Sequence, residues 1–494
     1  MKKDKVCLPF MLSDNLASEL DDKDKIYIRN IALKLKKADP KLDNTKNFGP
    51  LVRQGYHPGP VLFYEDHRTI ALSKVTSSFH YQYRFLLLAR QQDILLVENK
   101  RAPEYEKYCN DVLRLSPPET ICLTMGEKHL PLARRCCENN DAMTRLADIA
   151  RQNGCLNIMP YLSTGWTWAL AQRIAERANV PVYVMAPSPR LSQKANDKLW
   201  FSERVVDCMG PRALPRTYYA FGPAALAIKV SRLAETHSCI VIKVPSSAGS
   251  MGNMVLDAAF IRDMALPDLK EYLLALVAFP GGHQIYPLAV SVWDSKVVTS
   301  PSLQIWIPLA ETAPPIIEGV FEQALDPVTN SFIGAKPADL PGSLIEKLIQ
   351  GGSMISYLFQ QLGYYGRCSL DAVVMDKAGS HEIHWIECNA RWGGVSIPMT
   401  AAHRLTGQWQ EFLKIIVQSN QKNHISLHAD FQKDTAGFHY DPSREKAGIV
   451  LLNPSQYEHV AYHDYMTLAR EPTTAQCIFQ SVDKISKQIL QHHS

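Results

Sequence analysis

Short apolar runs and longer amphipathic segments alternate between about residue 91 and residue 190. The short runs have polar flanks and predict strands, whereas the longer segments carry apolar residues three and four positions apart and predict helices. Regular alternation of strand and helix is typical of an α/β layer with a mainly parallel sheet. The expected strands are 94–97, 120–124, 156–161 and 182–186, and the expected helices are 104–115, 132–152 and 166–179.

The pattern is less regular on both sides of this layer. The beginning of the chain combines a charged helical segment (16–37), a polar stretch and a short expected strand (61–64), and we assign it no role. The end of the chain mixes polar helical sequence with one expected strand (448–452), and we expect it to pack on the domain before it. We therefore expect four parts: an N-terminal extension (1–90), an α/β domain (91–190), a part with the candidate chemistry (191–420) and a C-terminal segment (421–494).

The composition is that of an ordinary globular protein. At about 150 residues per domain, 494 residues correspond to about three folding units. The 46% hydrophobic and 21% charged residues exclude a wholly disordered chain, a collagen-like fibre and a small disulfide scaffold. A net charge of +4 over this length does not favour nucleic acid or an anionic membrane as the main partner.

No apolar run approaches the roughly 18 residues that a membrane-spanning helix needs. The longest candidate, 272–280, is expected to be a buried strand. Lys2, Lys3 and Lys5 before the apolar stretch 6–12 faintly resemble a signal peptide, but that stretch is short and contains a proline. The 11 cysteines are odd in number and scattered, which indicates buried thiols in a reducing compartment. We therefore expect a cytoplasmic protein.

A loop of small residues follows a strand-like run that ends in Lys243. Small side chains let backbone N–H groups approach phosphate oxygens, and a lysine at the end of the strand adds a positive charge. Such loops also occur without any ligand, so the loop alone leaves the question open. Its candidate phosphate-binding residues are Ser246, Ser247, Gly249, Ser250 and Gly252.

The strongest pattern is an expected hairpin of two strands, 369–375 and 382–391. Side chains alternate along a strand, so Glu387, Asn389 and Arg391 share one face. If Gly379 lies at the centre of the turn, Asp371 and Glu387 face each other. Two opposed carboxylates repel each other unless a cation lies between them.

Carboxylate and amide oxygens are the ligands that Mg²⁺ accepts, and nucleotide phosphates commonly complete its coordination. Asp371, Glu387 and Asn389 are therefore candidate metal ligands, and Arg391 beyond them is placed to hold a phosphoryl group. The alternative is an exposed hairpin with a solvated polar face. The ordered set of four residues, followed by Gly393 and Gly394, favours the metal site.

This pattern resembles the ATP-grasp superfamily, whose signature is an acidic residue on one strand followed by a strand that reads apolar-Glu-x-Asn-x-Arg. Here the second strand reads Ile386-Glu387-Cys388-Asn389-Ala390-Arg391. The resemblance implies that Asp371, Glu387 and Asn389 bind Mg²⁺, with Mn²⁺ as an alternative ion, and that Arg391 contacts the reacting phosphate. It also implies an N-terminal parallel-sheet pre-ATP-grasp domain, followed by an α+β ATP-grasp fold.

The same resemblance implies further nucleotide contacts. Lys243 and a second lysine, Lys198 in an Asp-Lys pair that opens a helix, would bind the phosphates, with Lys194 as a weaker rival of Lys198. Arg367 is a candidate for the carboxylate of the substrate, and its alternative is a structural ion pair. The adenine would lie against a hinge whose usual glutamate is replaced by alanine in this chain. The candidate hinge residues are Leu276, Val277, Ala278 and Phe279.

The stretch from Asn389 to Ser396 is similar to that of peptide ligases of the pheganomycin type. The resemblance therefore implies an enzyme in which ATP activates a carboxylate as an acyl phosphate, and an amine then forms an amide or peptide bond. Expected partners are a small carboxylate and an amine, with no nucleic acid and no membrane, and the oligomeric state, a homodimer included, stays open. Three alternatives remain: another ATP-grasp reaction such as carboxylation or phosphoryl transfer, an ATP-binding protein without turnover, and a binding module without nucleotide.

Overall fold

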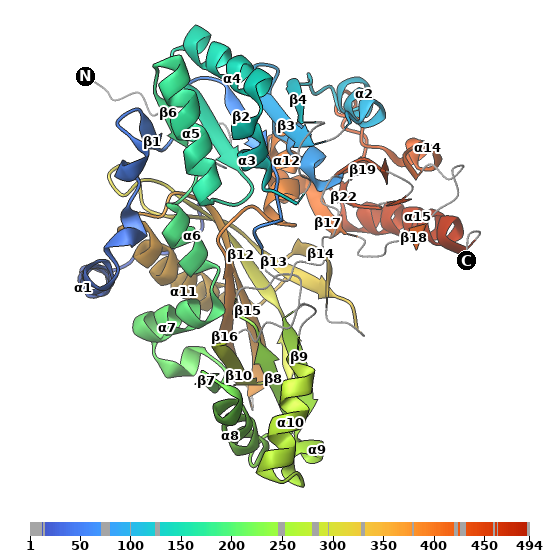
Figure 1. The fold of residues 1–494 in the computed structure, drawn as a ribbon. Coiled ribbons are helices and arrows are strands. Elements are labelled where there is room, and N and C mark those ends of the chain that lie inside the picture. Colours follow the sequence, from blue (N-terminus) through green and yellow to red (C-terminus); the bar gives the residue numbers. More distant parts are fainter. Residues whose placement is uncertain are drawn as a thin grey trace.

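The structure is a computed structural model of the 494-residue chain. It describes residues 12, 15–70, 80–98, 100–123, 129–245, 252–278, 286–294, 296–327, 331–377, 380–418, 423–424, 431–457, 460–461 and 463–491. Three larger sheets organise these residues: a parallel sheet near the beginning of the chain, a small antiparallel lobe, and a long antiparallel sheet that reaches the end of the chain (Figure 1). Among the helices of these residues, none is long and apolar enough to cross a membrane.

The first sheet has six strands, all parallel, which confirms the expected α/β layer. Helices pack on it, and α5 begins with a capping box at Thr164. Across the sheet the order is β1 (Val52–Gln54), β6 (Val182–Val184), β5 (Leu156–Pro160), β2 (Val61–Tyr64), β3 (Ile94–Glu98) and β4 (Glu119–Leu123). Its helices are α2 (Pro103–Asp111), α3 (Leu132–Glu138), α4 (Asn140–Asn153) and α5 (Gly165–Ala178).

The expected boundary at residue 91 cuts this sheet and is corrected by the strand order. β2 lies at the centre of the sheet, and β1 pairs with β6 at its edge. The single helix expected over 132–152 is two helices, because Asn139 leaves the helical conformation and caps α4. The segment before the sheet belongs elsewhere: α1 (Asp22–Ala38) packs on α11 (Gly342–Gln361) of the later part of the chain.

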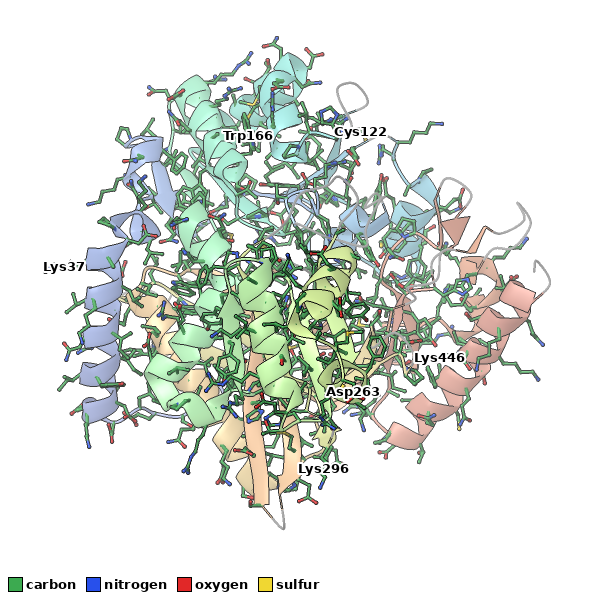
Figure 2. The ribbon with its side chains drawn as sticks, turned by 60° about the horizontal axis from the view of Figure 1, so that its bottom comes forward. Lys37, Cys122, Trp166, Asp263, Lys296 and Lys446 are labelled. Atoms are coloured by element: carbon green, nitrogen blue, oxygen red, sulfur yellow. The ribbon has the colours of Figure 1, made fainter. Side chains whose placement is uncertain are left out.

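A small antiparallel lobe follows the connecting helices α6 (Pro189–Ala195) and α7 (Lys198–Met209). Its strand order is β7 (Thr217–Ala220), β10 (Leu288–Val292), β8 (Cys239–Lys243) and β9 (Asn253–Asp257). Its helices are α8 (Pro223–Ala234), α9 (Ala258–Arg262) and α10 (Leu266–Leu276). These elements share one apolar core, and Figure 2 views the molecule with this end of it turned forward and Asp263, after α9, labelled.

A nine-stranded sheet carries the rest of the molecule. Its order is β11 (Val297–Thr299), β15 (Gly366–Lys377), β12 (Pro301–Ile307), β13 (Ile316–Leu325), β14 (Phe332–Pro337), β17 (Leu413–Val417), β22 (Tyr465–Leu468) and β19 (Gly448–Leu451), and β16 (Ser380–Asn389) also pairs with β15. The C-terminal segment thus contributes β19 and β22 to this sheet, and α15 (Pro472–Gln491) packs against it. α12 (Ser396–Thr406) follows the hairpin of β15 and β16.

Candidate active site

A cavity lies where the small lobe meets the long sheet. The lobe contributes the end of β8, the start of β9 and the residues after β10, and the sheet contributes β13, β15 and β16. The polar and charged residues that line it are Lys198, Lys243, Asn253, Asp294, Ser300, Gln323, Asp371 and Glu387. Residues almost two hundred positions apart in the sequence therefore line the same cavity.

The hairpin of β15 and β16 pairs Asp371 with Glu387, as predicted, but by another route. Near its tip Val373 pairs with His384, a register that would set Asp371 opposite Ile386. A β-bulge between Asp371 and Ala372 then shifts the register by one residue. A bulge turns side chains to the other face, so it decides which residue of β16 meets Asp371.

Burial follows the expected alternation at the end of β16. Glu387, Asn389 and Arg391 are each half-buried, whereas Cys388 and Ala390 between them are buried in the core. Glu387 and Asn389 therefore share one face of β16, and Glu387 lines the cavity. Arg391 lies beyond the end of the strand, where its backbone N–H donates to Asn389 O at 2.8 Å.

Asp371 is a half-buried carboxylate with two hydrogen-bond partners. Its Oδ1 accepts a hydrogen bond from the Ser302 hydroxyl at 2.6 Å, and its Oδ2 accepts one from Asn389 Nδ2 at 2.9 Å. Burial and the neighbouring charge of Glu387 nevertheless raise the pKa of Asp371 to about 7. The charged form of Asp371 is thus disfavoured at this place.

Two lysines surround this pair. Lys198 Nζ lies 2.9 Å from Glu387 Oε2. Burial acts to raise the pKa of Glu387, but the charge and hydrogen bond of Lys198, together with the charges of Arg391 and Lys243, outweigh burial, and the pKa is lowered. Burial and the charge of Lys198 lower the pKa of Lys243 to about 8. Lys198 lines the cavity and Lys194 does not, which favours Lys198 over its rival.

The residues around Lys198 fix the start of α7. Asp197 accepts hydrogen bonds from the backbone N–H groups of Leu199 and Trp200, so it caps the helix. The Lys198 backbone N–H donates to Pro245 O at 3.2 Å, directly before the small-residue loop. Of the candidate loop residues, Ser246, Ser247, Gly249 and Ser250 lie outside the described part of the chain, and Gly252 accepts from Val244 N at 2.8 Å.

The donor set fits a divalent cation. Two carboxylates and an amide supply hard oxygen atoms on one face of a hairpin. Burial first, and the charge of Glu387 second, raise the pKa of Asp371, and a bound cation would oppose both effects. Glu387 Oε2 and both Asp371 oxygens already have polar partners, which fix the orientation of the carboxylates.

The strand expected at 272–280 is wrong over its described residues, and they do not support the predicted hinge at 276–279. Leu276 ends α10, Val277 is its C-cap and Ala278 is exposed, so this segment is the end of a helix and not a strand. None of the three lines the cavity, and Phe279 lies outside the described residues. The continuous apolar run misled the prediction, because short runs of this kind do not distinguish a strand from a buried helix face.

The segment after β10 occupies the cavity wall instead. Val292, Trp293 and Asp294 line the cavity, and they connect β10 of the lobe to the long sheet. The Asp294 carboxylate is mostly buried, and its Oδ2 lies 2.9 Å from His384 Nδ1 on β16. In the sequence, this segment is marked by the mainly apolar run of β10, followed by Trp293 and Asp294. The longer apolar run at 272–280 was chosen as the hinge instead.

Arg367 is not free to bind a substrate carboxylate. It is buried, its guanidinium forms an ion pair with Glu318, and it lies over the rings of Trp392 and Trp306 at 4.8 and 5.3 Å. Burial lowers its pKa to about 9. The alternative of a structural ion pair therefore describes Arg367 in this structure.

Sequence reasoning also missed Ser302, Gln323 and Asn196. Ser302 and Gln323 are polar side chains in strands, and only the strand order brings them to Asp371. Asn196 Oδ1 accepts hydrogen bonds from Ala390 N at 3.1 Å and from Arg391 Nη1 at 2.5 Å. Its place directly before Asp197 and Lys198 was visible in the sequence, but its contact with the hairpin was not.

Comparison with protein families supports this organisation. Residues 82–175 match the family model described as "Pre ATP-grasp domain". A comparison with curated proteins found no match.

Solved structures of similar fold cover most of the chain at low identity. An N5-carboxyaminoimidazole ribonucleotide synthetase in complex with ADP is 11% identical, with a TM-score of 0.51 over 88% of this chain and 99% of that one. The biotin carboxylase domain of the Hydrogenobacter thermophilus 2-oxoglutarate carboxylase is 13% identical, with a TM-score of 0.51 over 86% and 89%. Biotin carboxylase from Campylobacter jejuni is 12% identical, with a TM-score of 0.51 over 85% and 89%. The chain therefore has an ATP-grasp fold preceded by a pre-ATP-grasp domain.

Proposed function

We propose that the protein is an ATP-dependent enzyme that activates a carboxylate as an acyl phosphate and joins it to an amine, with release of ADP and phosphate. One observation carries the proposal: two buried lysines and an opposed pair of carboxylates surround one cavity between the lobe and the long sheet. This combination suits a polyphosphate and its cation, because the lysines attract the phosphates and the carboxylates attract the metal.

In this proposal the protein contributes charge and position, and no protein nucleophile is needed. Lys243 and Lys198 bind the phosphate chain, and Arg391 stabilises the charge that develops on the transferred phosphoryl group. Asp371, Glu387 and Asn389 would hold Mg²⁺, which supplies further neutralisation of the phosphates when it is bound. The carboxylate of the substrate attacks the γ-phosphorus, and the amine then attacks the acyl carbon as phosphate leaves.

The segment 292–294 is the counterpart of the adenine hinge in this proposal. Val292 and Trp293 supply apolar surface for the base, and the Asp294 carboxylate is an acceptor for ribose hydroxyl groups. His384 holds one carboxylate oxygen through the 2.9 Å contact, which leaves the other oxygen for the nucleotide. Adenine recognition in this place replaces the hinge that the sequence predicted at 276–279.

Carboxylation is the second candidate, because the solved structures of the same fold include enzymes named as carboxylases. That reaction would use the same nucleotide site with bicarbonate as the acid. Amide formation is favoured here by the similarity of the stretch from Asn389 to Ser396 to peptide ligases of the pheganomycin type, which also points to an amino acid or peptide as substrate.

ADP release tests the proposal directly. Purified protein is incubated with Mg-ATP and pooled amino acids and dipeptides, and the products are analysed by mass spectrometry. ADP together with a species lighter by one water than its two parents supports amide ligation. ADP that depends on bicarbonate supports carboxylation, and neither binding nor turnover of ATP would overturn the proposed nucleotide site.

A further inference from the structure

Asn196 connects the turn before α7 to the strand end that carries Arg391. Its Oδ1 accepts from Ala390 N at 3.1 Å and from Arg391 Nη1 at 2.5 Å. Its Nδ2 donates to Ser192 O in α6 at 2.8 Å. The amide is thus held at both ends, so the position of its oxygen is fixed by α6 and not by Arg391.

The Arg391 side chain depends on this contact. Within the described residues, the structure gives its guanidinium one hydrogen-bond partner, which is Asn196. An arginine side chain has many rotamers, and a fixed acceptor at one nitrogen selects among them. Because the guanidinium has five N–H donors, the contact leaves most of them for another ligand.

Three consecutive residues, Asn196, Asp197 and Lys198, therefore each contact a different part of the candidate phosphate site. Asn196 orients Arg391, Asp197 caps α7, and Lys198 contacts Glu387 with its side chain and Pro245 with its backbone. Pro245 lies directly before the small-residue loop. The turn therefore links the hairpin, the start of the helix and the base of the loop.

We propose that Asn196 is a positioning residue that directs Arg391 toward the γ-phosphoryl group of the bound nucleotide, an inference that rests on the proposed function. Its removal should weaken contacts to the γ-phosphate and leave the contacts to the rest of the nucleotide unchanged. A merely structural role would instead weaken binding of nucleoside di- and triphosphates alike.

The test compares affinities for Mg-AMPPNP and Mg-ADP by calorimetry, so it needs no knowledge of the acceptor substrate. Wild-type protein should prefer Mg-AMPPNP, and Asn196→Ala should lose about tenfold of that preference, as expected for one hydrogen bond to a charged group. Asn196→Asp keeps an acceptor oxygen for Arg391 but loses the bond to Ser192 O, so it should retain more of the preference than Asn196→Ala. Arg391→Ala should lose it, and the double variant should lose no more than Arg391→Ala alone.

Asn153→Ala is the matched control. Asn153 also ends a helix and donates from Nδ2 to the carbonyl four residues earlier, Ile149 O, at 2.8 Å, but it lies in the parallel-sheet domain. Its variant should keep the preference unchanged. Equal loss of both affinities in Asn196→Ala, or additive losses in the double variant, would overturn the inference while the proposed function stands. Failure of wild-type protein to bind either nucleotide would instead remove the proposed function.

Discussion

At the scale of single residues, Glu387 has two roles that both depend on its negative charge. It neutralises Lys198 at 2.9 Å and shares a face with Asn389 as a candidate metal ligand. Glu387→Gln keeps the shape and removes the charge, so we expect ADP formation to fall about a hundredfold or more, as for other groups that stabilise the transition state. Glu387→Ala should abolish ADP formation, and circular dichroism would check that the fold persists. Glu411→Gln, at an exposed ion pair with Arg470, is the control, and unchanged turnover in Glu387→Gln would contradict the assignment.

Lys243 gives a pH dependence with a defined sign. Its pKa of about 8 lies below its ordinary value of 10.5, so the lysine loses its charge as the pH rises through 8. The affinity for Mg-ADP should therefore fall about tenfold between pH 7 and pH 9, if binding needs the charged form. The contribution of this group to folding has the opposite trend: the cost of its buried charge is present below pH 8 and disappears as the pH rises toward 10.5. Calorimetry at several pH values measures the affinity, and Lys243→Arg, which stays charged, should flatten its profile.

The position of a side chain could be predicted from the sequence where it follows from strand alternation. It could not be predicted where it depends on contacts between residues far apart in the chain. Alternation correctly placed Glu387 and Asn389 on one face of β16, whereas Arg391 lies beyond the end of that strand. The pairing of Asp371 with Glu387 was predicted with a turn centre that the bulge corrects. For Arg367 the sequence left a substrate contact and a structural ion pair both open, because its partner Glu318 lies on another strand, far along the chain.

At the scale of secondary-structure elements, the start of α7 is a stability and binding determinant. Asp197 accepts from Leu199 N at 2.8 Å and from Trp200 N at 3.1 Å, so Asp197→Ala should reduce the free energy of unfolding by about 1 kcal/mol. It should also weaken Mg-ADP binding, because Lys198 is the first residue of the helix. Asn139→Ala removes the equivalent cap of α4 and should cost similar stability with no change in nucleotide affinity. Equal affinities in the two variants would contradict the link between the cap and Lys198.

The strands expected in the parallel sheet lie within one or two residues of the observed ones, because short apolar runs between polar flanks identify buried parallel strands. The expected 61–64 strand coincides with β2, and the expected 94–97 strand is β3 without its last residue. The error at 272–280 arose in α10, where Leu269 and Leu273 face the lobe core and Leu276 is exposed. A helix with an apolar face and further exposed apolar residues gives the same local pattern as a buried strand.

At the scale of the whole molecule, domain limits depend on contacts that local sequence does not carry. The backbone of Leu16 donates to Ile317 O at 2.8 Å, and the backbone of Leu12 donates to Glu318 Oε1 at 3.0 Å. The beginning of the chain therefore packs on the long sheet, while β1 and β2 soon after it belong to the parallel sheet. Contacts of this kind join segments that are far apart in the sequence, so composition and periodicity do not predict them.

The two main sheets meet at a buried charged network, and its removal should destabilise the whole chain. Glu65 follows β2 and is fully buried, with an ion pair to Arg84 and a hydrogen bond to His67, and Arg84 lies 4.4 Å from the ring of Tyr81. Tyr161 stacks on His67, and its carbonyl accepts from Trp392 N at 3.0 Å, directly after Arg391. The network therefore connects the carboxyl ends of the parallel strands to the strand end of the active site.

Arg84→Leu would leave the Glu65 carboxylate buried without its main cation, which typically costs about 3–5 kcal/mol of unfolding free energy. The double variant with Glu65→Leu should recover much of this loss, because an apolar pair replaces the buried ions. Arg145→Leu breaks an exposed ion pair with Glu119 in the same domain and should cost less than about 1 kcal/mol. Urea unfolding of the full chain measures all three variants. A cost for Arg84→Leu as small as that for Arg145→Leu would show that Glu65 finds water or another cation, and the junction between the sheets would then owe its stability to apolar packing alone.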